Sequence, residues 1–147
     1  TGQRVLASLL TWMAEKKSAV FVIATANAID KLPAELLRKG RFDEIFFLDL
    51  PNSEERLSIL DLHLRKRRPN YNFPLSTIID RTDGYSGAEL EQAVIEGMHF
   101  SFDEKREIME KDLIKAVSEL VPLSRTAKEQ IDLLKQWSST GRARFAS

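Results

Sequence analysis

Two arginines at close spacing are the residues of this chain best suited to chemistry on a phosphate. Arg38 and Arg41 flank Gly40 in a predicted turn, a short distance after the apolar run 19–24 and the polar residue Asn27. Arginine stays protonated and presents a rigid planar fork of N–H donors that matches phosphoryl oxygens. Asn27 follows the predicted strand at its carboxyl end, where ligands bind in open α/β sheets. The pattern predicts a site where fixed cations meet the charge of a phosphate.

The same residues also have plainer interpretations. An asparagine in the loop after a strand is common in any α/β protein, and Arg38 could simply offset the dipole at the end of a helix. The dipole does not explain why Arg41 follows the glycine, with Phe42 and Asp43 able to anchor the turn. We therefore favour the phosphate interpretation for the pair of arginines.

The elements that must position these residues alternate between helix and strand. Apolar residues at helical spacing predict a helix over 5–13. The continuous apolar run 19–24 is typical of a strand buried on both faces of a parallel sheet. A short helix over 32–37 has proline in its first turn, and a second buried strand over 44–50 ends at Pro51.

Beyond Pro51 the pattern is helical throughout. Asn52 with Glu55 three residues later, and Ser86 with Glu89, predict two capped helix starts. Apolar spacing predicts further helices, at 75–80, 113–120 and 126–137. We expect an α/β part over 1–51, a helical bundle over 52–137 and a flexible tail over 138–147, because the tail has no apolar periodicity.

Composition excludes several classes of function. The chain has 22 basic and 22 acidic residues among 147, so no overall charge favours nucleic acid or an anionic membrane. The basic run 65–68 ends a predicted helix, where cations are favourable anyway, and we expect no nucleic-acid partner. The absence of cysteine excludes disulfides and thiolate metal sites. No apolar run is long enough to cross a bilayer, and the start without methionine suggests a piece of a longer protein.

Four motifs occur in the order and spacing of one known family. They are Ala24–Asn27, Arg38–Asp43, Leu50–Arg56 and Gly84–Leu90. Together they resemble the C-terminal portion of an AAA ATPase module over residues 1–121. The tail from Val121 resembles, more specifically, poorly characterised AAA proteins of cyanobacteria and plastids. The resemblance implies an incomplete P-loop NTPase core with parallel strands, followed by an all-α lid.

The resemblance also implies roles for the polar residues of the first part. Asn27 resembles the sensor asparagine that orients the attacking water, since an amide can accept from water and donate to phosphate at once. Arg38 and Arg41 resemble arginine fingers that reach into the nucleotide pocket of a neighbouring subunit. Lys39 stands where the family usually has proline, which could loosen the turn that aims Arg41.

In the lid, the resemblance implies three residues near the adenosine. Gly87 and Ala88 resemble positions whose small side chains let adenosine approach the backbone, and His63 resembles a histidine beside the base. Glycine is a poor helix former, so close approach explains Gly87 better than propensity does. The alternatives are a glycine that only eases entry into its helix and a lone histidine at a partly buried surface.

The family's phosphate-binding loop and its strand ending in paired acidic residues are not found in this sequence. ATP with Mg²⁺ is the implied cofactor, with the Mg²⁺ ligands and phosphate loop upstream and no metal ligand expected here. We expect the chain alone to be inactive and its parent to be an ATP hydrolase.

The implied partners are adjacent subunits of a homo-oligomeric ring, expected to be a hexamer, and a protein client that the sequence does not identify. The module would then drive the remodelling of a macromolecule in the cytoplasm or the plastid stroma, without a membrane. The alternative is a nucleotide-independent helical interaction module that keeps AAA-like packing.

Overall fold

A computed structural model describes residues 2–28, 31–37 and 42–146 of the chain. Most of these residues lie in helices, and the chain divides into two compact units. One unit joins Thr1–Leu48 with Asp132–Ser147, and the other is Asp49–Ile131. The domain limits drawn from the sequence, after residues 51 and 137, stay predictions.

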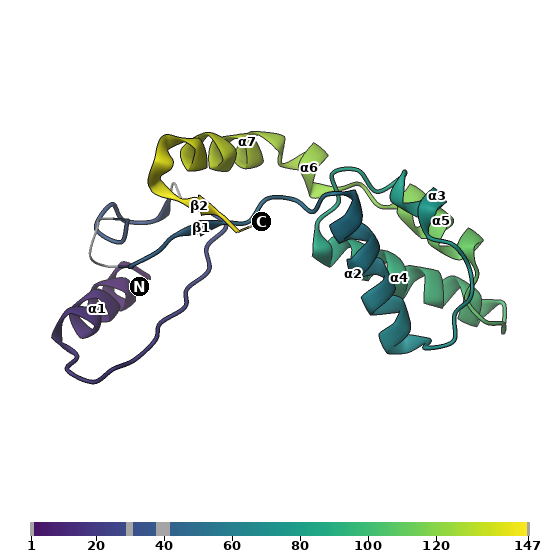
Figure 1. Ribbon diagram of the computed structural model, residues 1–147, viewed down its shortest axis with the longest axis horizontal. Helices are drawn as coiled ribbons and strands as arrows, with labels where there is room; N and C mark the ends of the chain where they lie inside the picture. Colours follow the sequence, from purple (N-terminus) through teal and green to yellow (C-terminus); the bar gives the residue numbers. More distant parts are fainter. Residues whose placement is uncertain (1, 29–30, 38–41, 147) are drawn as a thin grey trace. The chain divides into compact units, whose positions relative to one another are not determined.

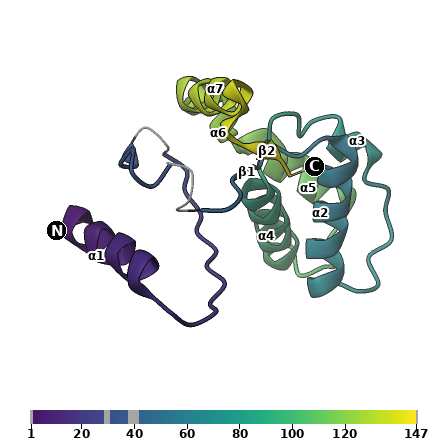
Figure 2. The same cartoon turned by 60° about the vertical axis from the view of Figure 1, so that its left-hand side comes forward.

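The Asp49–Ile131 unit is a helical bundle. Its helices are α2 (Ser53–Arg67), α3 (Ser76–Ile79), α4 (Gly87–Asp103), α5 (Glu110–Glu119) and α6 (Leu123–Thr126). Helix α4 packs against both α2 and α5, and α2 and α4 lie side by side in Figure 1 and Figure 2. The short α3 lies against α5 and closes the bundle.

Local capping chemistry explains where the two longest helices begin. The Asn52 side chain accepts from the Glu55 amide at 3.0 Å, and the Glu55 carboxylate accepts from the Asn52 amide at 2.8 Å. Ser86 and Glu89 make the same reciprocal pair at the start of α4. Both capping boxes satisfy backbone donors that a helix start leaves free, and both confirm the sequence prediction.

One apolar core holds this unit together. Its centre is formed by side chains with no exposed surface, namely Leu60, Leu64, Ile78, Leu90, Val94 and Leu113. They come from α2, α3, α4 and α5, so every main helix contributes its apolar face. Burying a leucine side chain stabilises a fold by about 1.5–3 kcal/mol, which makes these contacts the main source of stability here.

The turn before α4 is anchored to the far end of α5. The buried hydroxyl of Tyr85 donates to the carbonyl oxygens of Val117 and Leu120, at 2.7 and 2.8 Å. Gly84 precedes it with φ of 79°, and a Cβ at Gly84 would lie 2.5 Å from the Ser124 hydroxyl oxygen. Only glycine fits this turn without strain, so the first turn of α4 has a fixed place.

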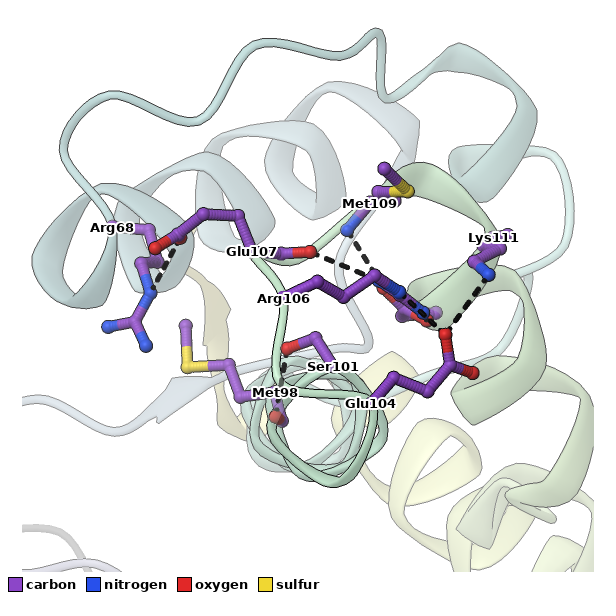
Figure 3. Close-up of polar contacts among 9 residues, drawn as sticks. Arg68, Met98, Ser101, Glu104, Arg106, Glu107, Met109 and Lys111 are labelled. Atoms are coloured by element: carbon purple, nitrogen blue, oxygen red, sulfur yellow. Dashed lines mark hydrogen bonds and ion pairs between the residues drawn. The ribbon is translucent and has the colours of Figure 1, made fainter.

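A charged network closes the loop between α4 and α5. Arg106 forms two parallel hydrogen bonds of 2.6 Å with Asp112, whose side chain is only 4% exposed. Asp112 also accepts from the Met109 amide at the start of α5. Figure 3 shows Arg106 and Lys111 both directed at the Glu104 carboxylate. The hydrogen bonds from Arg106 lower the pKa of Asp112 from 3.8, against the opposing effect of burial.

This lowered pKa predicts a loss of stability in acid. Because the pKa of Asp112 is lower in the folded state, its contribution is fully present above about pH 4 and declines as the pH falls further. As the pH falls from about 4 to about 2, the free energy of unfolding should therefore decrease less in Asp112→Asn than in the wild type. Urea unfolding followed by circular dichroism at several pH values measures it. Equal slopes in the two proteins would contradict the assignment.

The second unit contains less regular structure. It holds α1 (Gly2–Glu15), β1 (Phe46–Phe47) and β2 (Arg144–Phe145), and a π-helical turn over Ser138–Arg142. Helix α7 (Lys128–Trp137) runs across the boundary between the units. The β1 and β2 strands pair in parallel, and Arg144 bonds to the carbonyl oxygen of Ile45 at 2.8 Å and to Glu44 at 3.3 Å.

One strand prediction is wrong, and a second is wrong in extent. Residues 19–24 form no strand, and the strand expected over 44–50 is reduced to Phe46–Phe47. The residues expected as a helix over 32–37 form turns, with Leu36 bonding to Pro33 at 3.0 Å. A strand exists only when a neighbour satisfies its backbone groups, and within the described residues the run 19–24 has no such neighbour. The parallel α/β core is therefore not confirmed.

Burial shows the same difference between the units. Among the described residues of the Thr1–Leu48 and Asp132–Ser147 unit, Leu36 is the buried apolar side chain. Phe21 and Ile23, in the predicted central strand, are 90% and 80% exposed. Apolar residues such as these are typical of the interior of a parallel sheet, but here the other described residues leave them largely uncovered.

Candidate functional site

The residues predicted to act on phosphate are only partly described by the structure. Asn27 lies exposed at a bend after the extended run 19–26. Arg38 and Arg41 lie outside the described residues, so their distance from Asn27 is not part of the structure. The roles of all three stay predictions.

The residues predicted to face adenosine come together on two neighbouring helices. His63 lies in the second half of α2, and Gly87 and Ala88 form the first turn of α4. One turn before His63, Ile59 approaches Gly87, since a Cβ built on Gly87 would lie 3.8 Å from the Ile59 Cδ1 atom. We call the line of contact between α2 and α4 at Ile59, His63, Gly87 and Glu91 the α2–α4 seam.

Packing does not explain the glycine at position 87. The contact of 3.8 Å that its Cβ would make is an ordinary van der Waals distance, and no closer atom lies around it. Its backbone is at the first position of an α-helix rather than in the left-handed region. Alanine would therefore fit the fold at this position.

A cluster of three polar side chains lies on the seam. The Glu91 Oε1 atom is 3.2 Å from the His63 Nδ1 atom and 2.7 Å from the Arg67 Nη2 atom. Arg67 also places its Nη1 atom 3.3 Å from the same ring nitrogen and 3.4 Å from the His63 carbonyl oxygen. The hydrogen bond from Arg67 lowers the pKa of Glu91 from 4.5, so this carboxyl group is ionised at neutral pH. The ring of His63 is thus held by both helices.

A buried arginine positions the start of α2. The side chain of Arg56 is 9% exposed, donates to Thr82 at 3.2 Å and donates to the Pro51 carbonyl oxygen at 3.1 Å. Thr82 itself donates to the Ile79 carbonyl oxygen at 2.9 Å. Arg56 therefore ties the segment that enters the bundle to the turn before α4.

Sequence reasoning missed both the partners of His63 and the role of Arg56. Arg67 was considered only within the basic run 65–68, and Glu91 was not singled out. The signal that could have found them is spacing, because Ile59, His63 and Arg67 repeat every four residues, as do Gly87 and Glu91. Such repeats place side chains on one face of a helix. In this structure, the face of α2 and the face of α4 that carry these residues lie toward each other.

Two further observations limit the chemistry of the described residues. Among them, no three acidic or histidine side chains gather as a metal ion would require. None of their helices combines the length and apolar character needed to cross a bilayer.

Comparison with known proteins places the chain in a family. The family model described as "ATPase family associated with various cellular activities (AAA)" matches residues 1–50. Over 149 aligned residues that include the whole chain, it is 51% identical to the "Uncharacterized AAA domain-containing protein ycf46" of Pyropia yezoensis. The protein of the same name from Guillardia theta is 45% identical over 149 residues. The chain belongs to the AAA family.

The AAA relatives are much longer than this chain. It spans 30% of the length of the Pyropia yezoensis protein and 29% of the Guillardia theta protein. The "Proteasome-activating nucleotidase" of Pyrococcus abyssi is 37% identical over 131 residues, which cover 87% of this chain and 33% of that protein. This AAA chain therefore corresponds to about a third of each relative's length.

Proposed function

We propose that this chain is the C-terminal part of an AAA ATPase module, in which the α2–α4 seam faces the adenosine of bound ATP. The observation that carries the proposal is the seam itself, which brings His63 to the same helix pair as Gly87 and Ala88. A glycine that packing does not require, on the same seam as a histidine that contacts both helices, suits a flat apolar base with polar edges.

The polar residues of the Thr1–Leu48 and Asp132–Ser147 unit would act on the phosphates of ATP. Asn27 would orient the attacking water. Its amide oxygen would accept a hydrogen bond from the water, while its amide nitrogen donates one to phosphate. Arg38 and Arg41 would reach the pocket of the adjacent subunit and neutralise charge that grows on the transferred phosphoryl group. These roles assume a ring of identical subunits, for which we expect six members.

The Mg²⁺ ion and the phosphate-binding loop would be supplied by sequence outside this chain. When bound, Mg²⁺ offsets phosphate charge. The energy of hydrolysis would drive the remodelling of a protein client. The ycf46 relatives come from organisms with plastids, which favours the plastid stroma as its location.

The full-length protein provides the test of this function. It should bind a fluorescent ATP analogue and hydrolyse ATP, whereas the 147-residue chain should not hydrolyse it. If the full-length protein binds no nucleotide but still associates with a partner through its helical bundle, the chain is a nucleotide-independent interaction module instead.

Gly87→Ala separates the ligand interpretation of this residue from the structural one. Because the added Cβ makes only an ordinary contact with Ile59, the melting temperature should stay the same or rise slightly. The affinity of the full-length protein for ATP should fall by about tenfold, since the methyl group occupies space beside the ligand. Isothermal titration calorimetry measures the affinity. Unchanged binding would mean that the glycine only eases entry into α4.

A further inference from the structure

Among the described residues, Arg56 is the basic residue that the fold buries. Its side chain is 9% exposed and donates to two neutral oxygens, the Thr82 hydroxyl at 3.2 Å and the Pro51 carbonyl at 3.1 Å. The nearby carboxylate of Asp83 is 3.7 Å away and 95% exposed, so it is not a buried counter-charge. Burying a charge costs free energy, and an apolar side chain of similar size often stabilises a fold at least as well. The stability of the bundle therefore does not explain this arginine.

The bond to Pro51 holds the segment by which the chain enters the bundle. The boundary between the two units lies between Leu48 and Asp49, so residues 49–51 connect the bundle to the other unit. Helix α2 begins after its cap, Asn52, and the Arg56 side chain reaches back from the first turns of that helix to the Pro51 carbonyl. This bond limits the directions in which the segment 49–51 can leave the bundle.

The bond to Thr82 connects the same guanidinium to the turn that begins α4. Thr82 has no exposed surface, and its hydroxyl accepts from the Arg56 Nε atom while donating to the Ile79 carbonyl oxygen at 2.9 Å. The Thr82 carbonyl oxygen accepts from the Tyr85 amide at 3.1 Å, one residue before the cap of α4 at Ser86. Two hydrogen bonds in succession thus lead from Arg56 to the start of α4.

From these contacts we propose that Arg56 is a positioning residue, which holds the connecting segment 49–51 in one direction relative to the adenosine-facing start of α4. The proposal rests on the nucleotide site proposed above and adds how its two ends are aligned. ATP would contact the bundle through adenosine and the other unit through its phosphates, so binding must fix one unit relative to the other. A connection that Arg56 already holds leaves less conformational freedom to lose on binding.

The test uses Arg56→Met in the full-length protein, which replaces the guanidinium with an apolar side chain. Thr82 keeps its bond to the Ile79 carbonyl oxygen, so the melting temperature should change by less than about 5 °C. Arg68→Met is the matched control, because Arg68 pairs with the exposed Glu107 at the surface. Thr82→Val tests the other end of the connection, since it removes the oxygen that orients the Arg56 side chain.

Arg56→Met should raise the KM for ATP by roughly five- to thirtyfold, the effect of one backbone residue that binding must newly order. The kcat should stay within about twofold of the wild type, because saturating ATP selects the same bound arrangement. The inhibition constant of tripolyphosphate, which has no adenosine to contact the bundle, should not change. Arg68→Met should keep the wild-type KM.

Thr82→Val should raise the KM for ATP by less than Arg56→Met does, because the bond from Arg56 to Pro51 can still form. In the double variant it should add nothing to the effect of Arg56→Met, since Thr82 acts on the connecting segment through Arg56. An added effect in the double variant would overturn the proposed order of action.

The outcomes separate this proposal from the function on which it rests. A wild-type KM for ATP in Arg56→Met overturns the proposal, and so does an equal weakening of ATP and tripolyphosphate. An Arg56→Met protein that does not fold overturns it as well, because the arginine would then be needed for stability. If the wild-type full-length protein neither binds nor hydrolyses ATP, the proposed function fails and the inference falls with it.

Discussion

Replacing Arg41 with alanine in the full-length protein should lower the rate of ATP turnover by about a thousandfold and leave ATP binding nearly unchanged. An arginine finger acts on charge that develops in the transition state, so its loss affects the chemical step far more than the ground-state complex. Turnover is followed by phosphate release at saturating ATP, and binding by a fluorescent ATP analogue. Both measurements are made on the same preparation.

Arg68→Ala is the control for this experiment. Arg68 is an exposed arginine near the end of α2, paired at 3.2 Å with a glutamate, Glu107, whose side chain is 83% exposed. Removing a surface pair of this kind has little effect, so turnover should stay near the wild-type value. If Arg41→Ala instead weakened binding as much as turnover, Arg41 would be a ground-state contact rather than a finger.

The largest expected effect on stability comes from Leu64→Ala. Leu64 has no exposed surface and lies in the core between α2 and α4. Its truncation removes buried methyl groups and leaves a cavity, which should lower the free energy of unfolding by about 3 kcal/mol. Urea denaturation of the chain, followed by helical circular dichroism, measures the change.

The matched control lies two residues away on the same helix. Leu62 is 63% exposed, so Leu62→Ala should change the free energy of unfolding by less than about 0.5 kcal/mol. The two variants delete the same atoms from the same helix and differ only in burial. Similar losses in both would show that α2 does not present the face that the structure assigns to the core.

The helical bundle could be predicted because the sequence signals for each helix lie within the helix itself or next to it. A capping box is complete within four residues, and the starts at Asn52 and Ser86 were therefore predictable from the sequence. The apolar spacing that ends in Leu60 and Leu64 likewise marks one helix face without knowledge of its partner. The association of the chain with the AAA family, predicted from four short motifs, is confirmed by its relatives.

The strands could not be predicted from their own residues, because a strand needs a neighbour. The run 19–24 has the apolar character of a buried strand, yet most of its side chains are exposed and it pairs with no strand of the described residues. Phe46–Phe47 became a strand because the distant segment Arg144–Phe145 lies beside it. Nothing in the composition of the tail indicates that pairing.

In the candidate site, too, contacts between separate segments could not be predicted from the sequence. His63, Gly87 and Ala88 could be selected by resemblance, residue by residue. The contact of His63 with Glu91 joins two helices and depends on how they are rotated, which helical periodicity alone does not determine. Arg56 was missed for the same reason, since its partners Thr82 and Pro51 belong to other segments.

The central claim is that an active site of this AAA module is shared between subunits, with Asn27 in one and Arg41 in the next. Mixing full-length Arg41→Ala and Asn27→Ala proteins, each inactive alone, under conditions that exchange subunits tests it most directly. Random exchange at equal amounts would pair an intact pocket with an intact finger at about a quarter of the interfaces of a head-to-tail ring, so ATP turnover should reappear. Turnover that stays at the level of the separate variants would contradict the claim.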